Sequence, residues 1–181
     1  MTTLARGLRL SLAALALLAL PALAQHPQVR QGFWFNAGLG YGSLGCEDCD
    51  DREGGVSGAL AVGGTLAGGK LYLGAGTNGW TKKNDDLDLR LNVGALTALI
   101  RWYPSATGGF FLLGGLGVGS IKLSRNNVSV EQTGGAAIIG LGYDFRVGKN
   151  VSLTPFWNGY GVHTDDVDAN VGQIGLGLTV H

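Results

Sequence analysis

Two cysteines stand close together in a polar segment of this chain. Cys46 and Cys49 form a C-x-x-C pair within the acidic segment 46–53. Such a pair can close a disulfide in an oxidising compartment, act as a redox couple, or supply half of a zinc site. The βαβ pattern that accompanies redox couples is absent, and His163 is the further imidazole that a zinc site would need. We favour a structural Cys46–Cys49 disulfide, and the other two uses stay open.

Acidic residues are the second group with chemical potential. Twelve of the thirteen lie in four short segments, at 46–53, at 85–88, at Glu131 and at 165–168. Clustered carboxylates are hard oxygen ligands that suit Ca²⁺ or Mg²⁺. A solvated loop is the plainer interpretation, since no complete EF-hand pattern is present. The candidate ligands for a weak Ca²⁺ or Mg²⁺ site are Glu47, Asp48, Asp50, Asp51, Asp165, Asp166 and Asp168.

The N-terminus has the pattern of an export signal. Arg6 and Arg9 precede an apolar run at 10–20, and the segment 21–24 ends in the A-x-A pattern of a cleavage site. The run is shorter than the roughly 20 residues that span a bilayer as a helix. We therefore predict a cleaved signal peptide at 1–24, a short periplasmic segment at 25–31 and one domain at 32–181. Without Arg6 and Arg9, eleven basic residues face thirteen acidic ones, which does not favour nucleic-acid binding.

The remaining chain alternates between apolar residues and glycine or polar residues. Phe33, Phe35 and Leu39 occupy odd positions, whereas Asn36 and Gly38 occupy even ones. Side chains on a strand point to opposite faces with this period of two. Each alternating stretch exceeds the roughly 9–11 residues of a tilted membrane strand. The eight predicted strands are 32–44, 55–67, 70–81, 88–103, 109–121, 133–147, 151–163 and 169–181.

The connections between these strands are of two kinds. Those near 68–69, 104–108 and 148–150 are tight, whereas those at 45–54, 82–87, 122–132 and 164–168 are mostly longer and polar. Short turns on one side and longer loops on the other are typical of an outer-membrane barrel. A soluble barrel is the alternative, and the Gly32-Phe33-Trp34 segment does match the short G-x-W opening of lipocalins. A soluble barrel would, however, carry its large apolar residues inside and polar ones outside.

The face with glycine, asparagine and occasional charges is predicted to line a narrow lumen, and the apolar face to meet lipid. In the stretch 88–103 this rule assigns Arg90, Asn92 and Gly94 to the lumen. Aromatic residues near the short turns are predicted to form the interfacial girdle. They are Phe33, Trp34, Phe35, Trp102, Tyr103, Phe110, Phe111 and Phe145.

Asp144 is the acidic residue that lies outside the polar segments. Strand parity places it on the lumen face with Arg146, near the short-turn end. Arg101 would lie at the same depth if a bulge near Ile100 turned it inward. Because an isolated buried carboxylate is costly, we predict that Asp144 pairs with Arg146 or Arg101. Such a pair would plug and stabilise the lumen, and gating of a narrow passage is the alternative.

The signal, the alternating strands and the final segment at 172–180 resemble the small outer-membrane β-barrel family. That group includes the OmpA-like transmembrane domain and the OmpX- and OmpW-type porin-like proteins. The resemblance implies an eight-stranded antiparallel barrel in the bacterial outer membrane, in contact with its lipid and inserted by the assembly machinery. The family commonly ends in Phe or Trp, whereas this chain ends in His181. We expect a monomer.

The function expected from these features is a structural or envelope-interaction role, with acidic loops outside and an unspecified extracellular ligand. A narrow porin-like channel is the alternative. A lipid A-modifying enzyme would need His and Ser together at the outer rim. His163 with Asp165 and Asp166, approached by Ser124 or Ser129, is the nearest candidate, but no G-x-S-x-G is present. We expect no enzymatic activity, and no cofactor other than the weak Ca²⁺ or Mg²⁺ already considered.

Overall fold

A computed structural model describes residues 30–46, 51–84, 89–125 and 128–181 of the chain. The predicted signal peptide therefore lies outside the described residues, as does the segment 25–29. No helix in the described part is long and apolar enough to cross a membrane. The elements are β1 (Phe33–Cys46), β2 (Glu53–Leu66), η1 (Ala67–Gly69), β3 (Leu71–Asn84), β4 (Leu89–Trp102), β5 (Phe110–Arg125), β6 (Val128–Tyr143), β7 (Phe145–Arg146), β8 (Val151–His163) and β9 (Asp168–Val180).

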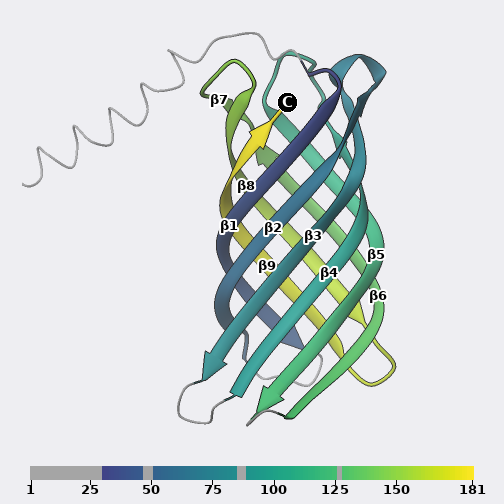
Figure 1. The fold of residues 1–181 in the computed structure, drawn as a ribbon, viewed down its shortest axis with the longest axis vertical. Helices are drawn as coiled ribbons and strands as arrows, with labels where there is room; N and C mark the ends of the chain where they lie inside the picture. Colours follow the sequence, from purple (N-terminus) through teal and green to yellow (C-terminus); the bar gives the residue numbers. More distant parts are fainter. Residues whose placement is uncertain (1–29, 47–50, 85–88, 126–127) are drawn as a thin grey trace, which may run out of the picture.

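The strands form one closed antiparallel sheet, because β9 pairs with β1 (Figure 1). β6 and β7 are two parts of one strand, since both pair with β8 in the same register. Gly142 lies opposite Phe156, and Phe145 lies opposite Leu153. The break falls at Asp144, whose backbone N–H donates to the Gly109 carbonyl at 2.9 Å. The predicted barrel of eight strands is confirmed.

The outer surface of the barrel is apolar around much of its circumference. Leu39 is 73% exposed, Leu116 72% and Ile139 64%, and similar residues follow on the other long strands. A water-soluble protein rarely exposes so large a contiguous apolar patch. In lipid, however, the closed sheet satisfies its backbone hydrogen bonds internally while this band faces the acyl chains.

Glycines on the lumen face make room for large aromatic side chains. A Cβ at Gly142 would lie 2.5 Å from the ring of Phe111, and one at Gly38 would lie 2.6 Å from the ring of Phe156. These contacts are shorter than packed atoms tolerate, so the rings occupy space that a larger residue would need. The lumen is therefore more aromatic than predicted. Its buried aromatic residues are Trp34, Tyr72, Trp80, Tyr103, Phe111, Phe156 and Tyr160.

The predicted lumen face of β4 is wrong. Val93, Leu99 and Arg101 are buried inside, whereas Arg90 is exposed and Gly94 shares its outward parity. β4 pairs with β3 and β5 in an unbroken register, so no bulge turns Arg101 inward. Arg101 faces the lumen because its odd position places it there. Polar residues at the extracellular end of β4 point outward beyond the apolar band, and this makes the two faces look reversed.

The predicted aromatic girdle is correct for its outward-facing members only. Trp34, Tyr103 and Phe111 are almost completely buried in the lumen. The side chains that face outward near the turns are Phe33, Phe35, Trp102, Phe110 and Phe145, with Tyr143 beside them. Neighbouring positions on a strand alternate between faces, so nearness to a turn does not by itself place an aromatic ring at the lipid interface.

The segment 122–132 is mostly sheet rather than a long polar loop. Lys122 pairs with Glu131 and Arg125 pairs with Val128, so β5 and β6 continue close to residues 126–127. Where a strand continues past the membrane, its outward-facing residues can be polar. The change to polar residues in this segment therefore marks the end of the apolar band and not the end of the strand. Because the hairpins project further beyond the apolar band on this side than on the side of η1, we assign it to the outside of the cell.

Candidate functional site

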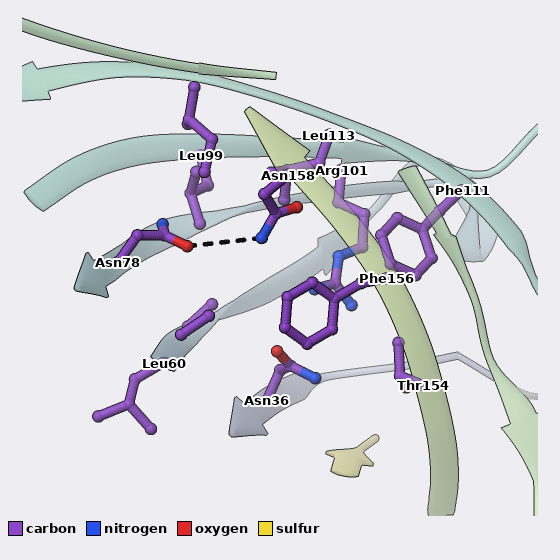
Figure 2. A pocket seen from close by; sticks show the side chains of 13 residues that line it. Asn36, Leu60, Asn78, Leu99, Arg101, Phe111, Leu113, Thr154, Phe156 and Asn158 are labelled. Carbon is purple, nitrogen blue, oxygen red and sulfur yellow. Dashed lines mark hydrogen bonds between the residues drawn. The ribbon is translucent and has the colours of Figure 1, made fainter. Parts of the chain in front are cut away.

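Side chains fill the middle of the lumen (Figure 2). Phe156 from β8 and Leu99 from β4 project into it, and the side-chain amide of Asn158 donates to Asn78 across the lumen at 3.4 Å. The space left among these residues is about 20 Å³. That volume holds about one water molecule. The described lumen therefore contains no continuous passage for a hydrated ion at this level.

The extracellular half of the lumen is filled by the aromatic rings of Trp80 and Tyr160 and by buried valine side chains. The indole N–H of Trp80 donates to the Gly42 carbonyl at 3.0 Å, and the hydroxyl of Tyr160 donates to the Val93 carbonyl at 3.4 Å. Both rings are almost fully buried. Each polar tip is therefore satisfied by the wall, so the rings are held in place as packing groups.

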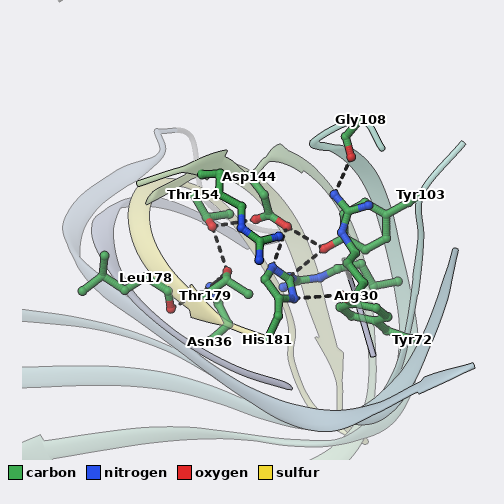
Figure 3. A network of polar contacts seen from close by, with 12 residues as sticks. Arg30, Asn36, Tyr72, Tyr103, Gly108, Asp144, Thr154, Leu178, Thr179 and His181 are labelled. Carbon is green, nitrogen blue, oxygen red and sulfur yellow. Dashed lines mark hydrogen bonds and ion pairs between the residues drawn. The ribbon is translucent and has the colours of Figure 1, made fainter. Parts of the chain in front are cut away.

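Asp144 is the centre of a polar network at the periplasmic end of the lumen (Figure 3). Its carboxylate accepts hydrogen bonds from the hydroxyls of Tyr103 and Thr154, each at 2.7 Å. Thr154 also bonds the hydroxyl of Thr179 at 2.8 Å, and the amide of Asn36 donates to that same hydroxyl at 2.8 Å. The network thus links β6–β7, β8, β9 and β1 through groups that are all buried.

Two arginines lie over aromatic rings beside this network. The guanidinium of Arg101 lies 4.2 Å from the centre of the Phe111 ring and donates to the Tyr103 hydroxyl at 3.5 Å. The guanidinium of Arg30 lies 3.7 Å from the centre of the Tyr103 ring. Arg30 also donates to the carbonyls of Ala106, at 3.1 Å, and Gly108. Arg30 precedes β1, so it closes the periplasmic mouth and ties that segment to the β4–β5 turn.

His181 turns its imidazole into the lumen. Its Nδ1 lies 2.8 Å from the Tyr72 hydroxyl, and its Nε2 lies 3.6 Å from the Asp144 carboxylate. Its backbone N–H donates to the Asn150 carbonyl at 2.9 Å. The even positions of β9, such as Val180, face lipid, and His181 therefore continues the inward row.

The predicted charge cluster of Asp144, Arg146 and Arg101 lies at one end of the lumen, and all three side chains are buried. Arg101 reaches Asp144 through the Tyr103 hydroxyl. Arg146 donates to the carbonyl of Gly148 at 3.2 Å and to that of Lys149. A direct Asp144–Arg146 or Asp144–Arg101 pair stays a prediction.

We expect Arg30→Ala to lower the free energy of unfolding by about 1–2 kcal/mol. The variant loses a desolvated cation–π contact and two hydrogen bonds to the turn. Urea unfolding in detergent micelles, followed by the heat-dependent gel shift of the folded barrel, measures the effect. Lys70→Ala is the matched control, because Lys70 lies at another periplasmic turn and is exposed. Equal midpoints for the two variants would mean that Arg30 contributes nothing to the seal.

The acidic candidates for metal binding are only partly described. Asp166 accepts from the Gln132 amide at 2.6 Å, and Asp168 lies 2.5 Å from Nδ1 of His163. Within the described residues, no group of three or more His, Cys, Asp or Glu side chains could hold a metal ion. Glu47, Asp48 and Asp50 lie outside those residues, as does Cys49. Cys46 ends β1 and is not a free cysteine, while its pairing with Cys49 and the metal site both stay predictions.

The candidate catalytic group does not come together. His163 contacts Asp168, and its strand position lies opposite Gly135 on β6. Ser129 is six residues further along β6, a separation of about 20 Å at the rise of a strand. Ser124 lies opposite Ser129 and is equally remote. In this arrangement neither serine can be activated by His163.

Several residues of the periplasmic network were not predicted as site residues. Tyr103 was predicted at the end of the strand 88–103 as part of the aromatic girdle, and Arg30 precedes the first strand. Tyr72 meets His181 although the two are 109 residues apart. Thr154 stands on the same face as Asn158 and could have been found from alternation along β8. The other contacts depend on closure of the barrel, which the alternation pattern does not specify residue by residue.

Comparison with known proteins identifies the family. The model of the outer membrane protein beta-barrel domain matches residues 10–179. The chain therefore belongs to this family of bacterial outer-membrane proteins. No curated protein sequence matches the chain.

Solved structures show the same fold. Neisserial surface protein A is 15% identical, with a TM-score of 0.62 over 82% of this chain and 96% of that one. The attachment invasion locus protein Ail of Yersinia pestis is 15% identical, with a TM-score of 0.55 over 83% and 99%. Ail in complex with the heparin analogue sucrose octasulfate is 16% identical, with a TM-score of 0.59 over 82% and 99%. At this identity the likeness is one of fold.

Proposed function

We propose that the protein is a structural and interaction protein of the outer membrane, which acts through its outer wall and extracellular end. The observation that supports this most is the filled lumen, where about 20 Å³ remains among the central side chains. A porin-like channel would need a continuous polar path, and aromatic rings stand across that path instead. We further propose that the protein is inserted as a monomer by the assembly machinery and has no enzymatic activity.

The extracellular end supports an interaction role. The described segments at this end carry the acidic residues Asp51, Glu53, Glu131, Asp165, Asp166 and Asp168, and the acidic residues of 47–50 and 85–88 lie outside the described residues. The structural neighbours include a surface protein and an attachment protein, one of them solved with a heparin analogue. A polyanion of that kind would meet repulsion from the acidic segments here. The proposed extracellular partner is therefore cationic, and weak Ca²⁺ or Mg²⁺ binding belongs to the same proposal.

Complementation of a deletion strain tests this function. Cells expressing the wild-type protein are compared with cells in which residues 47–52 and 164–167 are replaced by Gly-Ser segments of equal length. The heat-dependent gel shift checks that both barrels are folded. We expect the replacement to abolish binding of cells to a cationic surface while leaving the barrel intact. Full binding by the replacement variant would contradict a role for the extracellular end.

A further inference from the structure

The hairpin of β5 and β6 projects past its neighbour β8 at the extracellular end, which is the lower end of Figure 1. β6 pairs with β5 as far as Val128, but it pairs with β8 only from Gly135 onward. Residues 128–134 therefore extend about 20 Å further at the rise of a strand. β3 and β4 continue beside β5, since Leu89 lies opposite both Asn84 and Arg125. We call residues 82–84, 89–92, 121–125 and 128–134 the protruding sheet.

The apolar side of these strands changes from the outer face to the inner face in the protruding sheet. Within the barrel, large apolar residues such as Val118 and Ile139 point outward. In the protruding sheet the outer face carries Lys83, Arg90, Asn92, Lys122, Ser124, Ser129, Glu131 and Thr133. Its inner face, which continues the lumen side, carries Leu89, Leu91, Ile121, Leu123, Val128 and Val130, together with Lys82, Asn84, Arg125, Gln132 and Gly134. The apolar residues of the inner face are therefore not placed to meet lipid.

Part of this apolar inner face is open. Val130 lies opposite Leu123, and Val128 occupies the next inward position of β6. The exposed fractions are 44% for Leu123, 69% for Val128 and 62% for Val130. Leu91, on the other side of Leu123, packs instead against the buried core of the barrel. An exposed apolar patch that meets neither lipid nor the core is typical of a binding surface.

Polar groups border the patch on two sides. On the side of β3, Lys82 forms an ion pair with Glu53 of β2. On the other side, the Gln132 amide donates to Asp166 at 2.6 Å, and the Thr164 hydroxyl donates to Gln132 at 3.1 Å. These two bonds hold the acidic segment 164–167 beside β6.

The charge of this end of the barrel selects the sign of a partner. Twelve acidic and six basic residues stand in the segments 46–53, 82–90, 122–131 and 163–168, and six of the acidic ones lie outside the described residues. Arg125 is the exposed cation of the inner face at the tip, whereas Asp165 is exposed beside Asp166. An acidic excess favours a cationic partner. It disfavours a second copy of this chain, which would bring the same excess.

We propose that the inner face of the protruding sheet binds a cationic amphipathic peptide segment. The apolar side chains of the peptide lie on Leu123, Val128 and Val130, in the way that amphipathic segments dock on apolar surfaces. Its basic side chains lie beside Asp165 and Asp166. The proposal rests on the proposed function, because it specifies the chemistry and the docking surface of the cationic extracellular partner.

Fluorescence anisotropy of a labelled amphipathic peptide of leucine and lysine tests the proposal. The full barrel is placed in phosphatidylcholine nanodiscs, whose lipid adds no net charge, and empty nanodiscs give the background. Val128→Ser combined with Val130→Ser is expected to weaken binding by about tenfold, since burial of each methyl group contributes roughly fourfold. Asp165→Asn is expected to weaken it by about two- to fivefold. The loss in Asp165→Asn should shrink at high salt, because screening weakens contacts between exposed charges.

Two control variants separate the inner face from the rest of the surface. Val147→Ser removes an exposed valine at a periplasmic turn, and Glu131→Gln removes a charge from the outer face of β6. Both should bind the peptide within about twofold of the wild type. The heat-dependent gel shift checks that every variant is folded. Losses in the controls as large as those in the inner-face variants, or no loss in the inner-face variants, would overturn the site.

The remaining outcomes separate this proposal from the proposed function. A dimer seen by sedimentation and lost on replacement of Val128 and Val130 would assign the face to a second copy and overturn the peptide. Equal binding of a peptide with glutamate in place of lysine would overturn the cationic partner. Absence of peptide binding, while cells still bind a cationic surface through the extracellular end, would overturn the inner face alone. Absence of both would contradict the proposed function as well.

Discussion

Asp144→Leu is expected to lower the free energy of unfolding by about 3–5 kcal/mol, the usual cost of removing one partner from a buried charged network. The carboxylate accepts from Tyr103 and Thr154 inside the barrel, and Arg101 reaches it through Tyr103. Without it, two buried hydroxyls lose an acceptor and the buried Arg101 charge loses its counterpart. The midpoint of urea unfolding in detergent or lipid measures the loss.

Two further variants show whether the effect belongs to the network. Asp51→Asn removes a carboxylate that is exposed at the extracellular end, and it should change stability by less than about 0.5 kcal/mol. Asp144→Leu combined with Arg101→Met should cost less than the sum of the single variants, because coupled residues are not additive. Additive losses, or a single loss as small as that of Asp51→Asn, would contradict the network.

Gly63→Ala is expected to cost about 3 kcal/mol, at the upper end of the range for overpacking a well-packed site. A Cβ at Gly63 would lie 2.1 Å from the Leu73 carbonyl oxygen and 2.7 Å from the Cα of Gly74. Both atoms belong to the backbone of the neighbouring strand, so a side-chain rotation cannot relieve the contact. Strands β2 and β3 would have to separate locally, which weakens their ladder.

Gly79→Ala is the matched control, because it adds the same methyl group to an open position of the same strand pair. It should be neutral or slightly stabilising, since alanine loses less backbone entropy on folding than glycine. Unfolding midpoints and the fraction of heat-shifted protein after refolding compare the two. Similar behaviour of the two variants would show that β2 and β3 do not approach as closely as the structure indicates.

Alternation alone predicted the strands well. One face of each strand meets lipid and the other meets the lumen, so the residue type changes with a period of two along the strand. It also predicted the inward face of β1 and β9, where glycine and Gln173 oppose leucine and isoleucine. It failed on β4, where Val93 and Leu99 pack against rings inside the lumen. The hydrophobicity of a strand face does not distinguish a face that packs apolar side chains into the lumen from a face that meets lipid. Which face of β4 points inward is determined by its packing against the neighbouring strands.

The candidate site was predictable in part. Asp144 stood out as the single acidic residue outside the polar segments, and its burial beside Arg146 follows from the predicted parity. The inward position of Arg101 did not follow, because the predicted faces of β4 were reversed and a bulge that the register excludes was needed to turn it inward. Trp34 occupies the glycine-bearing face of β1, so the alternation already indicated a lumen position. The contacts of Arg30 and His181 could not be predicted, since they depend on where the closed barrel brings distant segments together.

Single-channel recording in planar bilayers tests the filled lumen most directly. We expect no steady conductance steps from the purified wild-type barrel at any applied voltage that the bilayer tolerates. A variant with Phe111, Phe156 and Tyr160 all replaced by alanine provides the reference for an opened lumen, provided that it keeps its heat-dependent gel shift. Steady steps from the wild-type protein would contradict a sealed barrel and would restore the channel as its function.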